Sequence, residues 1–492
     1  MEKTHKGLSA IHLTMMALGT VIGGSFFLGS SVAIEAAGPA IIISYILGGA
    51  LVYIILYAFS ELTVANPDSG SFRTFATQAF GPAAGFTVGW VYWTGMVLAM
   101  SSEATAVSIL IREWVPNVSI SILGSSIIIG VTLLNLLGAD KLSKLESGLA
   151  AVKLFAIAAF ILLAILLIAG LIPGTASIGA GEIAREPLLP GGIRGIAGSM
   201  LIVIFSYAGF EIIGLAASET DNPRKTVPKA ITYTVISLVG FYIVSVAVLL
   251  PLVPTAALNE NVSPMVAALN RWGMGWAGTA INFVLITAIL STMLAAMFGL
   301  GRMMRSLAQE GHAPGWLKDE REVPCRGILF SGFAMLAGLG TGLLLPRVYL
   351  FLVSSGGFAL LFTYAVIMAT HIRLRKRQGC PPDGKCQMPG YPATSWLALI
   401  SLIAIIFSMP FIPGQASGLI AGIIMIVAYT CIYIAVKIVF VRHRNRLFID
   451  DDKGKGLRTR LSTEFSRELI EDIKKKKRKR HADREKNKAG DE

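Results

Sequence analysis

The chain has 492 residues, of which 54% are hydrophobic and only 15% are charged, and its mean hydropathy is +0.66. This balance lies outside the range of soluble globular domains and excludes a soluble enzyme or binding module. The formal net charge is +13, but more than half of it lies beyond residue 440, where 18 Lys and Arg face 11 Asp and Glu. The basic character therefore belongs to a terminal tail, and we predict no nucleic-acid partner.

The apolar residues come in blocks of about twenty, the length an α-helix needs to cross a hydrocarbon core of about 30 Å. The blocks lack the alternation of barrel strands, so the sequence predicts an all-α polytopic membrane protein. About twelve transmembrane helices are predicted, over residues 11–33, 39–62, 85–110, 119–138, 149–172, 196–218, 230–252, 276–300, 327–345, 349–370, 394–412 and 418–440. They form a transmembrane domain over residues 11–440, between an N-terminus over 1–10 and a basic tail over 441–492.

The cations predict the orientation of the chain. The connections after even-numbered spans carry Arg73, Lys141, Lys144, Arg224, Lys225, Lys229, Arg302, Arg305, Lys318, Arg321, Arg326, Arg373, Arg375, Lys376, Arg377 and Lys385. The opposite connections carry only Arg112, Arg185, Arg194, Arg271 and Arg347. The positive-inside rule then places both termini in the cytoplasm. The tail has Leu461, Phe465, Leu469 and Ile473 at helical spacing before the basic run 474–480, so we expect it to lie on anionic lipids.

Motifs of catalysis are missing from the sequence. It contains neither an HExxH nor a GxSxG motif, and the P-loop-like spacing from Gly379 to Cys386 ends in Cys where a Ser or Thr belongs. Cys325, Cys380 and Cys386 lie on or near predicted cytoplasmic loops, which favours reduced thiols over disulfides or a metal site. We therefore predict a protein that is not an enzyme and that needs no cofactor or metal.

Two apolar spans contain residues that weaken a helix. Paired glycines in the run from Gly19 to Phe27 cost a helix interior about 1 kcal/mol each relative to Ala, which predicts a break near residues 22–25. A second break is predicted in the sixth span, between Phe205 and Glu211. Interrupted helices at matching positions of two halves are typical of a transporter's binding site. The alternative is that the small residues serve close helix packing.

The chemistry of a broken helix suits an amino acid. Unwound backbone leaves N–H groups free for a carboxylate and carbonyl groups free for an ammonium, and an α-amino acid presents both. The predicted substrate-binding residues are Thr20, Ile22, Gly23, Gly24, Ser25, Phe205, Ser206, Tyr207, Ala208 and Gly209. None of these residues is an acid that could bind a cationic side chain, so we favour a neutral amino acid as the substrate.

At these residues the sequence resembles the amino acid-polyamine-organocation (APC) superfamily, in particular its bacterial amino acid permease branch. The similar segments are Ala37-Gly38-Pro39, Ser60-Glu61-Leu62, Gly89 to Trp93 with Glu103 and Trp114, Glu146 with Lys153, Ser218 to Lys225 with Pro228-Lys229-Ala230, Arg302 to Pro314, and His371 to Arg373. The resemblance implies the leucine-transporter fold, with spans one to five and six to ten as inverted repeats and two helices appended. Two segments depart from the family pattern: residues 22–25 read IGGS instead of IGTG, and Tyr364 follows Phe362 and Thr363 where a Trp is common.

Three ionisable residues within the spans are candidates for proton coupling. Lys153 has apolar neighbours on both sides, and an ionisable group at that depth costs a few kcal/mol. The resemblance implies that it is placed like the sodium ion of related carriers, whereas the alternative is a side chain that snorkels to the cytoplasmic face. Glu211 follows the second break and is either a protonatable group near the pocket or a cap for backbone N–H groups. Glu103 is the third candidate, with pairing inside the bundle as its alternative.

The sequence thus predicts a secondary active transporter of the plasma membrane that imports amino acids, by proton symport and alternating access. Its predicted partners are an amino acid, protons and the lipid bilayer. An amino acid exchanger on the same fold is the first alternative. An amino acid-binding membrane sensor that signals through the tail is the second.

Overall fold

The computed structural model describes residues 9–65, 72–172, 177–211, 213, 220, 222–319, 321, 323–379 and 388–450. Within these ranges the secondary structure is helical, with no β-strand, so the predicted all-α fold class is confirmed. The basic run 474–480, the Cys380–Cys386 segment and most of the Ser218–Asp221 motif lie outside the described residues.

The described helices correspond to the twelve predicted spans. Nine helical segments of this part of the chain are long and apolar enough to cross a membrane. They comprise α3 (Gly29–Ala37) with α4 (Ile41–Ala65), α6 (Pro82–Ile111), α8 (Ala139–Ala169), α11 (Pro223–Leu249), α13 (Gly275–Gln309), α14 (Cys325–Leu343), α15 (Val348–Gln378), α16 (Ala393–Ser408) and α17 (Ala416–Asp450). Three shorter apolar helices are α1 (Ala10–Val21), α7 (Ile120–Asn135) and α9 (Gly192–Ser206).

Shorter elements connect the spans. The first span continues from α1 through α2 (Gly24–Phe27) into α3, and the 3-10 helix η1 (Gly38–Ala40) joins α3 to α4. Between the spans lie α5 (Phe72–Phe80), α12 (Pro264–Arg271) and the 3-10 helices η3 (Gly181–Ala184), η5 (Thr255–Ala257), η6 (Gly315–Leu317) and η7 (Met409–Phe411). Local residues explain several ends: Pro82 starts α6 at a position that tolerates a missing N–H, and Gly170 ends α8 in the left-handed conformation.

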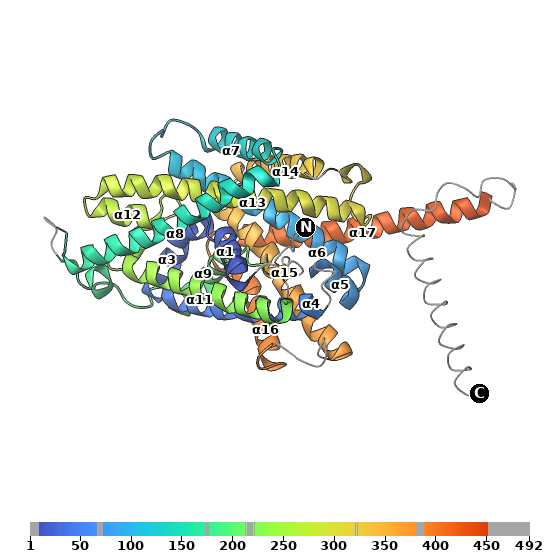
Figure 1. Ribbon diagram of the computed structural model, residues 1–492, viewed down its shortest axis with the longest axis horizontal. Helices are drawn as coiled ribbons and strands as arrows, with labels where there is room; N and C mark the ends of the chain where they lie inside the picture. The colour runs from blue at the N-terminus through green and yellow to red at the C-terminus, as the bar shows by residue number, and fades with distance from the viewer. Residues whose placement is uncertain are drawn as a thin grey trace, which may run out of the picture.

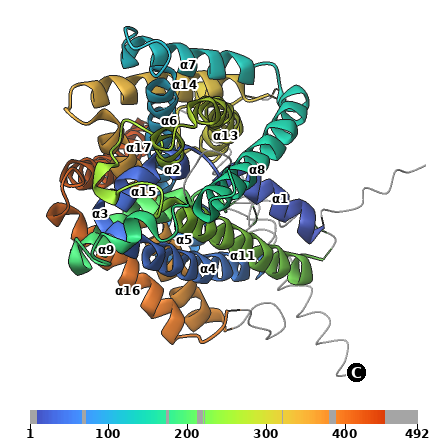
Figure 2. The ribbon, with the colours of Figure 1, turned by 90° about the vertical axis from the view of Figure 1, so that its left-hand side faces the viewer.

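The core of the bundle is built around α6 and α15. In the most apolar stretch of each helix, 72% of the residues of α6 and 83% of those of α15 are buried, against 6% of those of α17. Figure 1 shows the long helices side by side, with α17 reaching beyond the bundle at its C-terminal end. Figure 2 places α2 and α15 inside the bundle and α7 and α16 on opposite sides. The large apolar side chains that α17 exposes, such as Ile420, Ile424 and Val427, suit a lipid-facing surface.

Candidate substrate site

The first span is interrupted where the glycine pair predicts it. Helix α1 ends at Val21, Ile22 and Gly23 are extended, with φ −73° and ψ 104° for Ile22 and φ −145° and ψ −163° for Gly23, and α2 begins at Gly24. Two residues in extended conformation cannot continue the i→i−4 hydrogen-bond ladder, so the backbone groups around them need other partners. The predicted break near residues 22–25 is confirmed.

The second break lies directly against the first. Helix α9 ends at Ser206, and turns over residues 207–211 interrupt the predicted sixth span. Gly209 has a φ of +106°, which L side chains rarely adopt, and its carbonyl accepts a hydrogen bond from Thr20 Oγ1 at 3.2 Å. A Cβ at Gly209 would lie 3.1 Å from the Thr20 carbonyl oxygen. Thr20 and Gly209, two of the predicted site residues, therefore join the two breaks.

A protein carboxylate occupies the backbone amides of the first break. Glu103, on α6 and only 4% exposed, accepts the Gly24 N–H at 2.7 Å with Oε2 and the Ser25 N–H at 3.3 Å with Oε1. Glu103 is therefore hydrogen-bonded inside the bundle, and its role in proton coupling stays a prediction. Its partners are the amides for which the sequence predicts a substrate carboxylate, so the structure confirms that this backbone can hold a carboxylate.

Lys153 links the first break to two other helices. The side chain is 1% exposed, and its Nζ donates to the Gly19 carbonyl and to Thr292 Oγ1, both at 2.8 Å. Thr292, on α13, in turn lies 3.1 Å from the Ile22 carbonyl oxygen. The lysine thus points toward the first span and does not snorkel. Thr292 was not predicted from the sequence, because a threonine in an apolar helix carries no signal of its own.

Glu211 holds the second break together. It is 3% exposed, accepts the Gly209 N–H at 2.9 Å and receives a hydrogen bond from the Tyr364 hydroxyl at 2.5 Å. The Tyr364 ring also stacks on Phe210, with ring centroids 5.1 Å apart. Glu211 thus caps a backbone N–H of the second break, and its role in proton coupling stays a prediction. A residue of the segment that departs from the family pattern, Tyr364, therefore contacts this acid.

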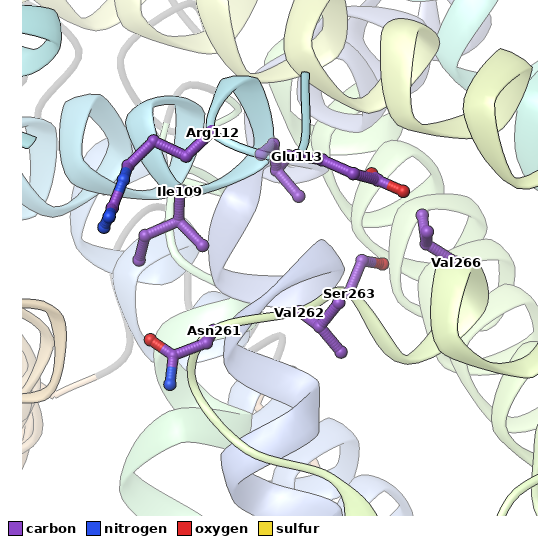
Figure 3. A pocket seen from close by; sticks show the side chains of 8 residues that line it. Ile109, Arg112, Glu113, Asn261, Val262, Ser263 and Val266 are labelled. Atoms are coloured by element: carbon purple, nitrogen blue, oxygen red, sulfur yellow. The ribbon is translucent and has the colours of Figure 1, made fainter. Parts of the chain in front are cut away.

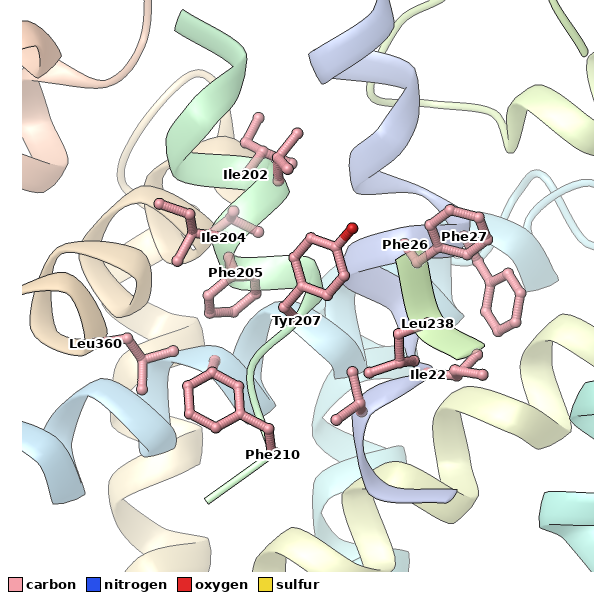
Figure 4. Close-up of a cluster of buried hydrophobic side chains, with 14 of the residues drawn as sticks. Ile22, Phe26, Phe27, Ile202, Ile204, Phe205, Tyr207, Phe210, Leu238 and Leu360 are labelled. Atoms are coloured by element: carbon pink, nitrogen blue, oxygen red, sulfur yellow. The ribbon is translucent and has the colours of Figure 1, made fainter. Parts of the chain in front are cut away.

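Aromatic side chains pack around the two breaks, and Figure 4 shows Phe26, Phe205 and Tyr207 beside them. Phe26 stacks on Tyr242 with ring centroids 4.0 Å apart, and the Tyr242 hydroxyl donates to the Ser206 carbonyl at 2.9 Å. Phe205 is buried, and the Tyr207 hydroxyl donates to the Tyr45 carbonyl. These contacts close one side of the breaks.

Exposure changes along the two breaks. Every residue from Val21 to Ser31 is buried, whereas Gly19 and Thr20 are partly exposed, as are Ala208 and Gly209 across from them. The described residues are therefore more exposed on the α1 side of the breaks than on the α2 and α3 side, which is the closed side.

A pocket lies farther along α6, on the closed side. It has a volume of about 310 Å³ and is lined by Ile109, Leu110, Arg112, Glu113, Asn261, Val262, Ser263 and Val266, seven of which Figure 3 labels. Glu113, the acidic residue of this pocket, accepts a hydrogen bond from Asn282 Nδ2 at 2.6 Å. With a rise of about 1.5 Å per residue, this end of α6 is two to three turns from Glu103.

Comparisons with known proteins agree with the geometry. The family model described as amino acid permease matches residues 12–448. The gamma-aminobutyric acid permease of Bacillus subtilis (strain 168) is 33% identical over 432 residues, which cover 86% of this chain and 92% of that protein. The aromatic amino acid transport protein AroP of Escherichia coli (strain K12) is 32% identical over 421 residues, with 84% and 92% covered. These relatives are carriers and not enzymes. The chain therefore belongs to the amino acid permease family of the APC superfamily and transports amino acids as a multi-pass protein of the plasma membrane.

Proposed function

We propose that the chain imports amino acids by proton symport, through alternating access around the two broken helices. The observation that carries the proposal is the position of Lys153, a titratable group whose Nζ lies 2.8 Å from the carbonyl of Gly19, beside the first break. A protonated lysine holds α1, α8 and α13 together through Gly19 and Thr292. A neutral lysine donates weaker, uncharged hydrogen bonds to these acceptors, so its titration changes the relative stability of the carrier's conformations.

The oxygen atoms around Lys153 explain why a proton, and not sodium, would be the coupling ion. Carbonyl and hydroxyl oxygens, here from Gly19 and Thr292, are ligands that suit a metal cation as well as an ammonium group. The lysine supplies a positive charge that belongs to the chain itself. Transport is therefore expected to be independent of sodium.

The backbone amides after the first break would bind the carboxylate of the substrate. Support comes from Glu103, whose carboxylate accepts hydrogen bonds from the N–H groups of Gly24 and Ser25. The names of two relatives, one a gamma-aminobutyric acid permease and one an aromatic amino acid transport protein, specify substrates that share a carboxylate and an amine but differ elsewhere. A backbone carboxylate site would serve both kinds. The residues from Thr20 to Ser25 and from Phe205 to Gly209 would form the rest of the site.

The substrate is identified by an uptake panel with the purified full-length chain in proteoliposomes. Radiolabelled forms of the twenty amino acids and γ-aminobutyrate are compared with liposomes that lack protein. Saturable uptake of at least one neutral amino acid or of γ-aminobutyrate is expected. Binding of these compounds without any flux would contradict the transporter proposal and support the membrane sensor.

The orientation of the chain makes a separate prediction. A reporter fused after Gly456 is expected to behave as cytoplasmic and one inserted near Gly181 as external, because cations crowd the connections after even-numbered spans. In this orientation the partly exposed Thr20 and Gly209 face the cytoplasm, and the basic run 474–480 would meet anionic headgroups of the inner leaflet. The two fusions are compared in a phosphatase and fluorescent-protein assay. The same side for both reporters would contradict the twelve-span prediction, in which the spans from the sixth to the twelfth cross the membrane an odd number of times between the two positions.

A further inference from the structure

Glu103 uses its whole carboxylate on the first break. Each of its oxygens accepts one backbone N–H, from Gly24 and from Ser25, and the side chain is 4% exposed. A Cβ at Gly24 would come within 2.5 Å of Glu103 Oε2, so the close approach requires glycine at this position. Charge-assisted hydrogen bonds of this kind are about twice as strong as neutral ones. The acid is therefore a bound ligand of these amides and not a neighbour by chance.

The substrate carboxylate needs the same two donors. Each backbone N–H donates one hydrogen bond, and Glu103 already accepts both. A second anionic carboxylate at this place would stand beside the first in a buried environment, where like charges at such short range cannot both stay ionised. An amino acid can therefore reach these amides only after Glu103 leaves them or loses its charge.

The groups that face Glu103 come from several helices. Lys153 on α8 attracts the carboxylate while its Nζ donates hydrogen bonds to Gly19 and Thr292. Tyr349 on α15 donates to the Gly24 carbonyl at 3.4 Å, and Tyr242 on α11 stacks on Phe26. Both tyrosines stand close enough to interact electrostatically with the acid. Glu211, the other acid of the site, is held by Tyr364 and Gly209 at the second break.

We propose that Glu103 is an internal substitute for the substrate's carboxylate, which holds the amides of Gly24 and Ser25 in the empty carrier and takes up a proton when an amino acid displaces it. The inference rests on the proposed function, since it requires that an amino acid binds at these amides. In the exchange the substrate carboxylate accepts the two N–H groups, and one proton from water moves onto the Glu103 carboxylate. The number of negative charges at the amides stays the same. Substrate binding thus adds one proton at Glu103, and the contacts of Lys153 with Gly19 and Thr292 set the relative stability of the conformations between which this proton and the amino acid are carried.

The exchange predicts a distinct pH dependence of binding. Where Glu103 is ionised in the empty carrier, the apparent Kd of the wild type rises by up to tenfold for each pH unit, because binding must bring a proton with it. Glu103→Gln cannot take up that proton, and its amide oxygen accepts at most one of the two N–H groups with no charge to assist the bond. Its Kd is expected to stay constant over the same pH range, and its affinity at alkaline pH should exceed that of the wild type.

The measurement is calorimetric binding to the full-length protein between pH 6 and 9, in buffers of different ionisation enthalpy. The probes are γ-aminobutyrate, L-phenylalanine and L-leucine. The wild type is expected to take up as much as one proton per bound molecule, and Glu103→Gln none. Glu35→Gln, which changes an exposed acid of α3, is the matched control and should behave as the wild type. Proton uptake that persists in Glu103→Gln, or binding by the wild type without proton uptake, would overturn the proposal.

A second variant tests the carboxylate site without any transported substrate. Glu103→Ala removes the CH2–COO⁻ portion of the side chain and leaves a space that matches acetate. Acetate, but not acetamide, is expected to raise the melting temperature of this variant and to leave that of the wild type unchanged. An amino acid probe should then compete with acetate for the variant. The opposite result is that acetate raises the melting temperature of the variant while the amino acid probes fail to displace it. That result would show that Glu103 is a permanent structural cap.

Failure of this inference can be told apart from failure of the proposed function. If the wild type transports none of the panel compounds, the proposed function fails whatever the variants do. The other case is that the wild type transports one of them and Glu103→Gln keeps the same proton uptake and the same pH dependence of Kd. Then only the proposal that Glu103 takes the place of the substrate carboxylate fails.

Discussion

Gly23→Leu is expected to weaken amino acid binding and uptake strongly. A Cβ at Gly23 would lie 3.3 Å from Thr292 Cγ2 and Oγ1 and 3.5 Å from Glu103 Oε1, so a leucine would extend into the space between these groups. The φ of −145° is open to any residue, so the effect comes from crowding and not from backbone strain. Overpacking of this kind costs about 1 to 3 kcal/mol, or roughly 5- to 150-fold in binding.

The control for this variant is a glycine-to-leucine substitution at a position where the side chain meets no neighbour. A Cβ at Gly240, on α11, would have no neighbouring atom within 4 Å, so Gly240→Leu should fold and transport as the wild type does. Size-exclusion profiles and melting temperatures report whether Gly23→Leu is folded. Methyl esters and amides of a transported amino acid test the same site from the ligand's side, since they lack the carboxylate that the amides would bind. An ester that competes as well as the free acid would indicate that the break serves helix packing.

Lys153→Met is expected to lose accumulation driven by a pH gradient while it still binds the amino acid. Methionine fills a similar volume but cannot donate to Gly19 and Thr292, so the contact that ties α8 to the first break and to α13 is lost. For symport of one proton, each unit of the pH gradient supports about a tenfold concentration ratio of substrate. The variant should instead reach a ratio of about one.

Glu211→Gln provides the comparison. Gln at this position can still accept from Tyr364 or Gly209, so the second break keeps part of its support. This variant is expected to change the pH profile or the affinity and to retain driven uptake. Uptake is followed in proteoliposomes for both variants, with and without sodium. If Lys153→Met still concentrates the substrate, the lysine is a structural residue and Glu211 becomes the better candidate for coupling.

The spans and their breaks follow from local sequence, which is why they were predictable. Apolar blocks of membrane length determine the helices, and the glycines at 23 and 24 weaken one helix whatever surrounds it. The sixth span was predicted to break between Phe205 and Glu211, and α9 ends at Ser206. The positive φ of Gly209 and the hydrogen bond from its N–H to Glu211 were not predicted, because local patterns do not report them.

The partners of the candidate residues could not be predicted, because they are distant in the chain. Glu103 is 79 residues from Gly24, and Lys153 is 139 residues from Thr292. The sequence indicates that a buried acid or lysine needs a partner, but which one it finds depends on how the helices pack. The sequence therefore assigned the amides of Gly24 and Ser25 to a substrate, whereas the fold gives them to Glu103.

The most direct test of proton-coupled amino acid uptake is accumulation by the wild-type chain in proteoliposomes with an imposed inward proton gradient. Uptake of the compound identified by the panel is followed with and without a protonophore, in the absence of sodium. We predict transient accumulation above the external concentration that the protonophore abolishes. Uptake that ignores the pH gradient and depends on a second amino acid inside the vesicles would contradict symport and establish an exchanger.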